Sequence, residues 1–150
     1  MKKKILILNG PNLNLLHRRN KMIYGDSSIE KIERNCLDLA KEIDLEISFK
    51  QSNLEGEIVT EIQQAIDKFD GIIINAAAYT HTSIAIRDAL EMFPHPKIEL
   101  HISNIFRREA FRHHSFLSSV VDSVISGLGV DGYTIALLAI DGLIKNAEGK

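Results

Sequence analysis

Polar side chains that can bind oxygen-rich molecules or transfer protons follow three apolar runs of the sequence. They are Asn12, Asn14, Asn75, His81, His101, Ser103 and Asn104. Amides donate and accept hydrogen bonds, and a histidine changes charge near neutral pH. Taken alone, Asn75 could equally satisfy a turn and His81 could equally be an exposed loop residue. Their chemistry therefore depends on what the fold brings together.

Basic residues flank these positions. Arg108 and Arg112 are expected one helical turn apart, which suits bidentate hydrogen bonds to a carboxylate. The segment 17–24 is basic and has little periodicity, so we expect a long loop that can close over a binding site. Its Arg19 and Tyr24 are candidates for chemistry, with solvated surface as the alternative. Such residues suit acid–base chemistry on a small polyhydroxylated anion.

Apolar runs and turn residues predict the elements that position these groups. The expected strands cover residues 5–8, 45–49, 72–74, 97–102 and 120–125. The expected helices include residues 29–43, 58–69, 84–90 and 131–145. Alternation of five strands with five helices predicts an α/β fold, a doubly wound, three-layer parallel sheet of flavodoxin-like order 2-1-3-4-5. We expect residues 1–150 to form a single domain, with ligands beyond the carboxyl ends of the strands.

Composition narrows the function classes. With 45% hydrophobic and 25% charged residues and a formal charge of −2, the chain resembles an ordinary globular protein and gives no reason to expect nucleic acid. Residues 5–8 are too short a run for a signal peptide or a membrane span, so we expect no membrane partner. The single cysteine, Cys36, lies on an apolar helical face and is expected in the core. A reducing cytoplasm fits these features.

Two sequence patterns suggest a cofactor or a metal, but each lacks the further residues that such a site requires. Residues 127–132 spell G-x-G-x-x-G, but the dinucleotide fingerprint also needs a later strand with an acidic residue about 20 positions on, and the chain ends first. We expect these glycines to serve tight packing. His113 and His114 are adjacent and no H-x-x-x-H or C-x-x-C spacing occurs, so we expect neither a cofactor nor a metal.

Several blocks of sequence, in order along nearly the whole chain, closely resemble type II 3-dehydroquinate dehydratase. The blocks are residues 7–16, 24–25, 51–56, 79–83, 99–105 and 111–115. The resemblance implies a flavodoxin-like fold and a hydro-lyase activity. That activity would be anti elimination of water from 3-dehydroquinate to 3-dehydroshikimate, through an enolate, in the shikimate pathway.

The resemblance also implies catalytic roles. Tyr24 would remove the proton next to the ketone, and Arg19 would favour the ionised tyrosine. Asn12 would stabilise the enolate. Glu99 would orient His101, which would give a proton to the departing hydroxyl.

Further positions would hold the substrate. They are Asn75, His81, Asp88, Ile102, Ser103 and Arg112. Asp88 follows Ile84 by about one helical turn and is expected near the inner face of its helix. The family assembles as trimers packed into dodecamers, with Asp88 reaching the neighbouring site. No cofactor is implied.

The sequence differs from the family pattern at two places. Residues 17–21 read His-Arg-Arg-Asn-Lys where the family usually has Gly-x-Arg-Glu-Pro, and Ala76 and Ala77 replace Pro-Gly. A methyl group at position 77 would lie beside the substrate and would disfavour positive φ, which could slow turnover. A different class of function, a flavodoxin-like module that binds a small anion without catalysis, remains the alternative.

Overall fold

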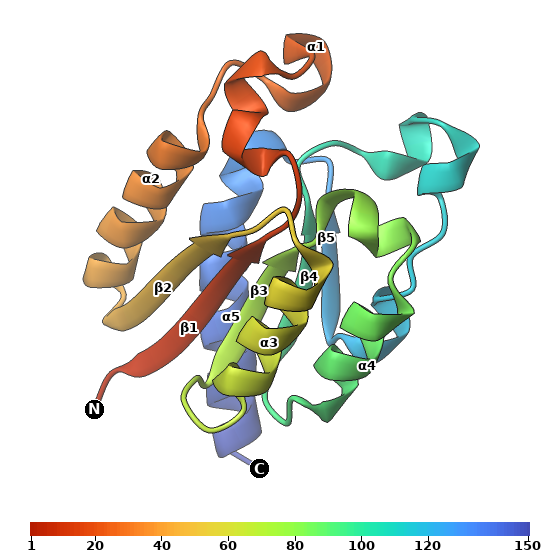
Figure 1. The fold of residues 1–150 in the computed structure, drawn as a ribbon. Helices are drawn as coiled ribbons and strands as arrows, with labels where there is room; N and C mark the ends of the chain where they lie inside the picture. Colours follow the sequence, from red (N-terminus) through yellow and green to blue (C-terminus); the bar gives the residue numbers. More distant parts are fainter.

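Five parallel strands form one sheet in the order β2-β1-β3-β4-β5 (Figure 1). The computed structural model describes residues 1–150. The strands are β1 (Lys3–Asn9), β2 (Leu45–Gln51), β3 (Gly71–Asn75), β4 (Lys97–His101) and β5 (Ser123–Ser126). The predicted strand order is therefore confirmed, with the half-buried β2 at one edge and β3 at the centre.

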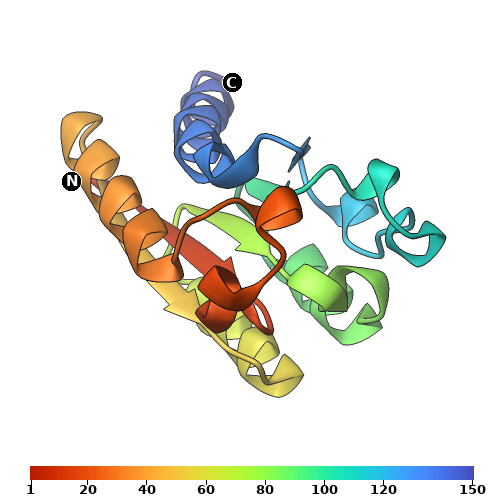
Figure 2. The same ribbon diagram turned by 90° about the horizontal axis from the view of Figure 1, so that it is seen from above.

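Helices cover both faces of the sheet. They are α1 (Lys21–Tyr24), α2 (Ile29–Glu42), α3 (Glu55–Ala65), α4 (Ile84–Met92) and α5 (Gly132–Glu148). Helices α2 and α5 pack on one face and α3 and α4 on the other, as the view from above shows (Figure 2). This arrangement confirms the predicted three layers. None of the helices has the length and apolar content needed to cross a bilayer.

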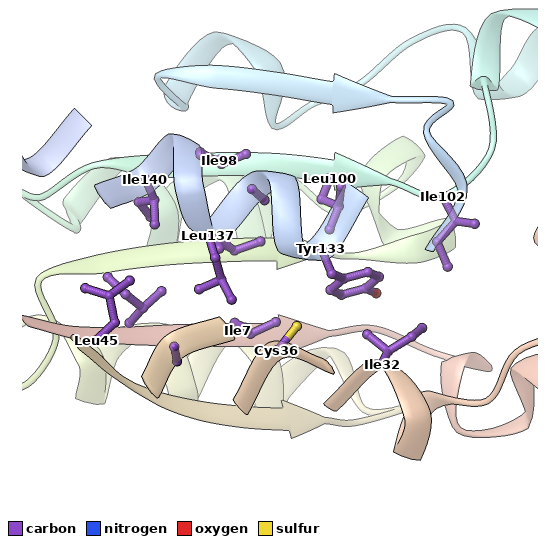
Figure 3. Close-up of a cluster of buried hydrophobic side chains, with 14 of the residues drawn as sticks. Ile7, Ile32, Cys36, Leu45, Ile98, Leu100, Ile102, Tyr133, Leu137 and Ile140 are labelled. Atoms are coloured by element: carbon purple, nitrogen blue, oxygen red, sulfur yellow. The ribbon is translucent and has the colours of Figure 1, made fainter. Parts of the chain in front are cut away.

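The apolar run of β1 serves both faces. Ile5 and Ile7 join the cluster under α2 and α5, whereas Leu6 and Leu8 join the cluster under α3 and α4. Alternation along a strand explains this split, and coverage on both sides explains why the run is continuous. Cys36 lies in the first cluster, beside α5 (Figure 3), and burial raises the pKa of its thiol to about 12. It is a core residue, as predicted.

The crossover from β4 to β5 differs from the prediction. Three short 3-10 turns replace a helix there: η3 (Ile105–Arg107), η4 (Ala110–Arg112) and η5 (Ser118–Val120). Phe106 and Phe111 stay exposed, so the segment offers no apolar stripe that a helix could bury on the sheet. Arg108 is extended between two of these turns. It is therefore not one helical turn from Arg112.

The segment after β1 is also more ordered than predicted. It forms the 3-10 turn η1 (Leu13–Arg18) and the single-turn helix α1. Leu13 and Leu16 are buried against the core, and the Asn20 side chain accepts a hydrogen bond from Met22 N at 3.0 Å. Two buried leucines and a local cap account for the structure that periodicity alone missed.

Candidate active site

A cavity of about 430 Å³ opens beyond the carboxyl ends of β1, β3 and β4. Most of the predicted site residues line it: Asn12, Arg19, Tyr24, Asn75, His81, His101, Ile102, Ser103 and Arg112. Asn75 and His81, whose roles were open from sequence, thus share one cavity. Glu99 lies directly beneath His101, and Asp88 lies outside the cavity.

The end of β1 approaches β3 very closely. A Cβ atom at Gly10 would lie 2.4 Å from the carbonyl oxygen of Ala76, so only glycine fits. The chain then turns through Asn12, whose φ of 70° is left-handed. Asn53 holds this turn, because its Oδ1 accepts a hydrogen bond from Asn12 N at 3.0 Å. These contacts place the Asn12 side chain at the cavity wall.

Tyr24 lies between two arginines. Its hydroxyl accepts hydrogen bonds from Arg19 Nη2 and Arg108 Nη1, each at 2.6 Å. Both guanidinium groups also lie over its ring, 4.3 Å and 5.0 Å from the centroid. Two cationic side chains therefore donate charge-assisted hydrogen bonds to one phenolic oxygen.

The contact between Arg108 and Tyr24 was not predicted from the sequence. The two residues are 84 positions apart, and Arg108 was predicted to bind a carboxylate. Its side chain is only 12% exposed, and it also donates to Ser103 Oγ at 3.1 Å. Arg108 thus links the loop after β4 to the segment after β1.

Glu99 and His101 form a buried pair on β4. They lie on the face opposite Ile98 and Leu100, as alternation predicted, and Glu99 Oε2 lies 2.5 Å from His101 Nε2. Ser115 and Ser118 each donate to the other carboxylate oxygen, at 2.9 Å and 2.8 Å. Burial opposes ionisation of Glu99, but the bonds from His101 and the two serines hold the pKa of this carboxyl below its usual range. The pair is a carboxylate bonded to an imidazole.

His81 contributes a neutral ring. Burial lowers its pKa, and the charges of His101 and Arg112 add to that effect, although the bond to the His114 backbone opposes it. His81 Nδ1 lies 2.8 Å from the carbonyl oxygen of His114, which can only accept, so Nδ1 carries the proton. Nε2 is then left as an acceptor for a donor in the cavity.

Asp88 does not lie near the inner face of its helix. Ile86, Ala89 and Leu90 face the core, which turns Asp88 outward, where its side chain is 60% exposed and pairs with Arg87 at 2.9 Å. The prediction failed because it took Ile84 as a core position, and Ile84 is itself 56% exposed.

The G-x-G-x-x-G segment supports the rim of the cavity. Gly127 N and Gly129 N donate to the carbonyl oxygens of His101 and Ile102, at 3.3 Å and 3.0 Å, and both glycines have positive φ. A Cβ atom at Gly132 would lie 3.0 Å from Leu100 Cδ1. The motif therefore braces the end of β4 and lets α5 pack closely. No group of three His, Cys, Asp or Glu side chains is arranged to hold a metal.

Ala77 adopts positive φ, the backbone conformation that its methyl group was expected to disfavour. Its φ is 52°, in the left-handed region, and its N–H donates to Asn75 Oδ1 at 3.2 Å. A residue other than glycine in this region carries about 1–2 kcal/mol of strain. Ala77 and Ala78 both line the cavity.

This fold and site define a class of protein: a flavodoxin-like sheet whose cavity is lined by tyrosine, arginine and histidine side chains, with a buried glutamate bonded to the histidine. The family model "Dehydroquinase class II" matches residues 3–141. The chain belongs to this family of class II dehydroquinases.

Related proteins are similar to this chain in sequence and structure over most of its length. A 3-dehydroquinate dehydratase from Bartonella tribocorum is 58% identical over 133 residues, which cover 89% of each protein. The crystal structure of the type II dehydroquinase from Propionibacterium acnes superposes with a TM-score of 0.91 at 42% identity, covering 95% of this chain and 98% of the other. That from Butyrivibrio crossotus gives a TM-score of 0.91 at 45% identity, covering 93% and 98%.

Proposed function

We propose that the cavity eliminates water from 3-dehydroquinate to give 3-dehydroshikimate, through an enolate, as a hydro-lyase of the shikimate pathway. The observation that carries this proposal is the pairing, in one cavity, of a tyrosine bonded to two arginines with a histidine bonded to a buried carboxylate. These are a base and an acid for one elimination. Membership of the class II dehydroquinases supports the substrate.

Tyr24 is the base in this proposal. Its phenolate takes the proton from the carbon next to the ketone, and Arg19 and Arg108 stabilise the phenolate by charge-assisted hydrogen bonds. Removal of this proton leaves negative charge on the ketone oxygen. Asn12, on the cavity wall, stabilises that charge by donating from its amide.

His101 is the acid. A carboxylate can only accept, so His101 Nε2 donates to Glu99 and the transferable proton resides on Nδ1. Glu99 stabilises the doubly protonated ring. When the carbon–oxygen bond of the substrate breaks, Nδ1 gives its proton to the departing hydroxyl, which leaves as water, and the ring returns to the neutral form.

The remaining lining residues hold the substrate. Arg112, fixed by Glu109 at 2.6 Å, suits the substrate carboxylate. Asn75 and His81 offer a donor and an acceptor to hydroxyl groups, and the backbone at Ile102 and Ser103 completes the rim.

Assembly and location follow the same proposal. Trimers packed into dodecamers would let Asp88, whose carboxylate is exposed and outside its own cavity, enter a neighbouring site. A cytoplasmic location, residues 1–150 acting as one catalytic domain, and the lack of a nucleic-acid or membrane partner complete the proposal.

Ultraviolet spectroscopy tests the activity directly. On incubation with 3-dehydroquinate, the protein should generate the absorbance of a conjugated enone, which the substrate lacks. Absence of this signal, with substrate binding retained, would favour the alternative of a non-catalytic anion-binding module.

A further inference from the structure

A buried tyrosine in the first turn of α5 connects two asparagines at the ends of neighbouring strands. Tyr133 is 1% exposed and lies near the carboxyl ends of the strands (Figure 3). Its hydroxyl donates to Asn9 Oδ1 at 2.6 Å and accepts from Asn75 Nδ2 at 2.9 Å. Asn9 and Asn75 are register partners on β1 and β3, and both are almost fully buried.

The backbone carbonyl of Lys50 determines the donor and acceptor at every step of this series of hydrogen bonds. The carbonyl oxygen of Lys50 can only accept, so the group of Asn9 that lies 3.0 Å away must be its amide nitrogen. Asn9 therefore presents Oδ1 to Tyr133 and takes the hydroxyl proton. The Tyr133 oxygen, having given its proton to Asn9, accepts from Asn75.

The same logic determines what Asn75 shows to the cavity. One N–H of its amide goes to Tyr133, and its Oδ1 accepts from Ala77 N at 3.2 Å. Both contacts agree on one orientation of the amide. The second N–H of Asn75 has no partner in the protein, and Asn75 lines the cavity.

We propose that Tyr133 is a positioning residue that locks the Asn75 amide with an N–H directed to the substrate, so that the site selects a hydroxyl or carboxylate oxygen as acceptor there. The inference rests on the proposed function for the identity of the substrate. Tyr133 does not line the cavity and acts only through Asn75. Burial raises the pKa of its hydroxyl, which keeps it neutral and able to donate and accept at once.

Steady-state kinetics test the proposal. Tyr133→Phe removes the hydroxyl and leaves only the 3.2 Å bond from Ala77 N to orient the Asn75 amide, and should raise KM for 3-dehydroquinate about tenfold while changing kcat by less than about threefold. Ile140→Val is the matched control, because it removes a methyl group from the same helix and the same core cluster. Equal effects of both variants on KM, at similar losses of Tm, would overturn the proposal.

A double-mutant cycle separates positioning from general damage. If Tyr133 acts through Asn75, adding Tyr133→Phe to Asn75→Ala should leave KM unchanged within about twofold. A further tenfold rise in the double variant would mean that Tyr133 acts by another route.

A measurement on the unchanged protein needs neither variant nor turnover. With ¹⁵N-labelled asparagine, NMR should show one Asn75 side-chain proton protected from solvent exchange and the other exchanging until substrate binds. Rapid exchange of both protons would refute the lock even if the enzyme is active. Protection without turnover of 3-dehydroquinate would instead leave the lock intact and contradict the proposed function.

Discussion

The proposed base and the proposed acid are held in contrasting ways. Tyr24 ends a single turn of helix above the sheet, and its hydroxyl is bonded to side chains from two loops. His101 ends a buried strand and is bonded to a residue of the same strand. The position of the acid follows from alternation along one buried strand. The position of the base depends on contacts between loops. We therefore expect the acid to be rigid and the base to depend on closure of the segment 17–24.

Removal of the Tyr24 hydroxyl gives the largest expected effect. Tyr24→Phe should lower kcat by about 10²-fold to 10⁴-fold, because the phenolic oxygen that takes the proton is gone, while Tm changes little. Tyr79→Phe is the control, since the Tyr79 hydroxyl bonds to the Asn53 carbonyl and does not line the cavity. Retention of wild-type kcat by Tyr24→Phe would remove the base from the mechanism.

Glu99→Gln tests the support that the buried carboxylate gives to His101. The variant keeps the size of the side chain but loses the charge that stabilises the protonated His101, so kcat should fall by about 10-fold to 100-fold. A loss confined to KM would mean that Glu99 holds substrate and does not support the acid.

Acid unfolding adds a second readout for the same variant. The pKa of Glu99 is lower in the folded protein than its usual value, so the unfolded state binds more protons between the two values. The resulting stabilisation is complete above roughly pH 5, beyond the unfolded pKa of about 4.3, and is lost as the pH falls through the lowered pKa. Wild type should therefore lose stability more steeply than Glu99→Gln on acidification, as measured by denaturant unfolding.

Substituting the two arginines bonded to Tyr24 one at a time shows which loop supports the base. Arg108 has a side chain that is only 12% exposed and also bonds to Ser103, whereas Arg19 belongs to the segment after β1. Arg108→Ala should therefore lower kcat about tenfold more than Arg19→Ala, as measured by steady-state kinetics. The reverse order would mean that the segment 17–24, and not the loop after β4, determines the ionisation of Tyr24.

A mixed assembly tests whether the site has a third part from another subunit. Tyr24→Phe and Asp88→Asn should each be nearly inactive, because each lacks one part of every site. Refolded together in equal amounts, they should regain up to about a quarter of wild-type activity, since a random neighbour supplies the missing part in that fraction of sites. No recovery, despite subunit exchange confirmed by mass spectrometry, would exclude a shared site.

The site residues at the ends of the strands were more predictable from sequence than the contacts between loops. Alternation in residues 97–102 placed Glu99 and His101 on one face, and β/α alternation correctly brought Asn12, Asn75 and His81 to one rim. The contact of Arg108 with Tyr24 depends on how two loops meet, and no periodicity encodes it. The outward direction of Asp88 was missed because Ile84 resembles a core residue but is exposed.

Backbone strain is present at Ala77, just after the central strand β3. With φ at 52°, Ala77→Gly should relieve the left-handed penalty, but glycine gains freedom in the unfolded chain, so the net stabilisation should be about 0.5–1 kcal/mol. For a domain of this size the expected rise in Tm is about 1–4 °C by calorimetry. Ala78→Gly, also at the cavity but without positive φ, is the control and should lower Tm slightly. If Ala77→Gly also raises kcat severalfold, the methyl group obstructs substrate; if Tm rises and kcat is unchanged, the strain is confined to the backbone and the position of Asn75 is set independently of it.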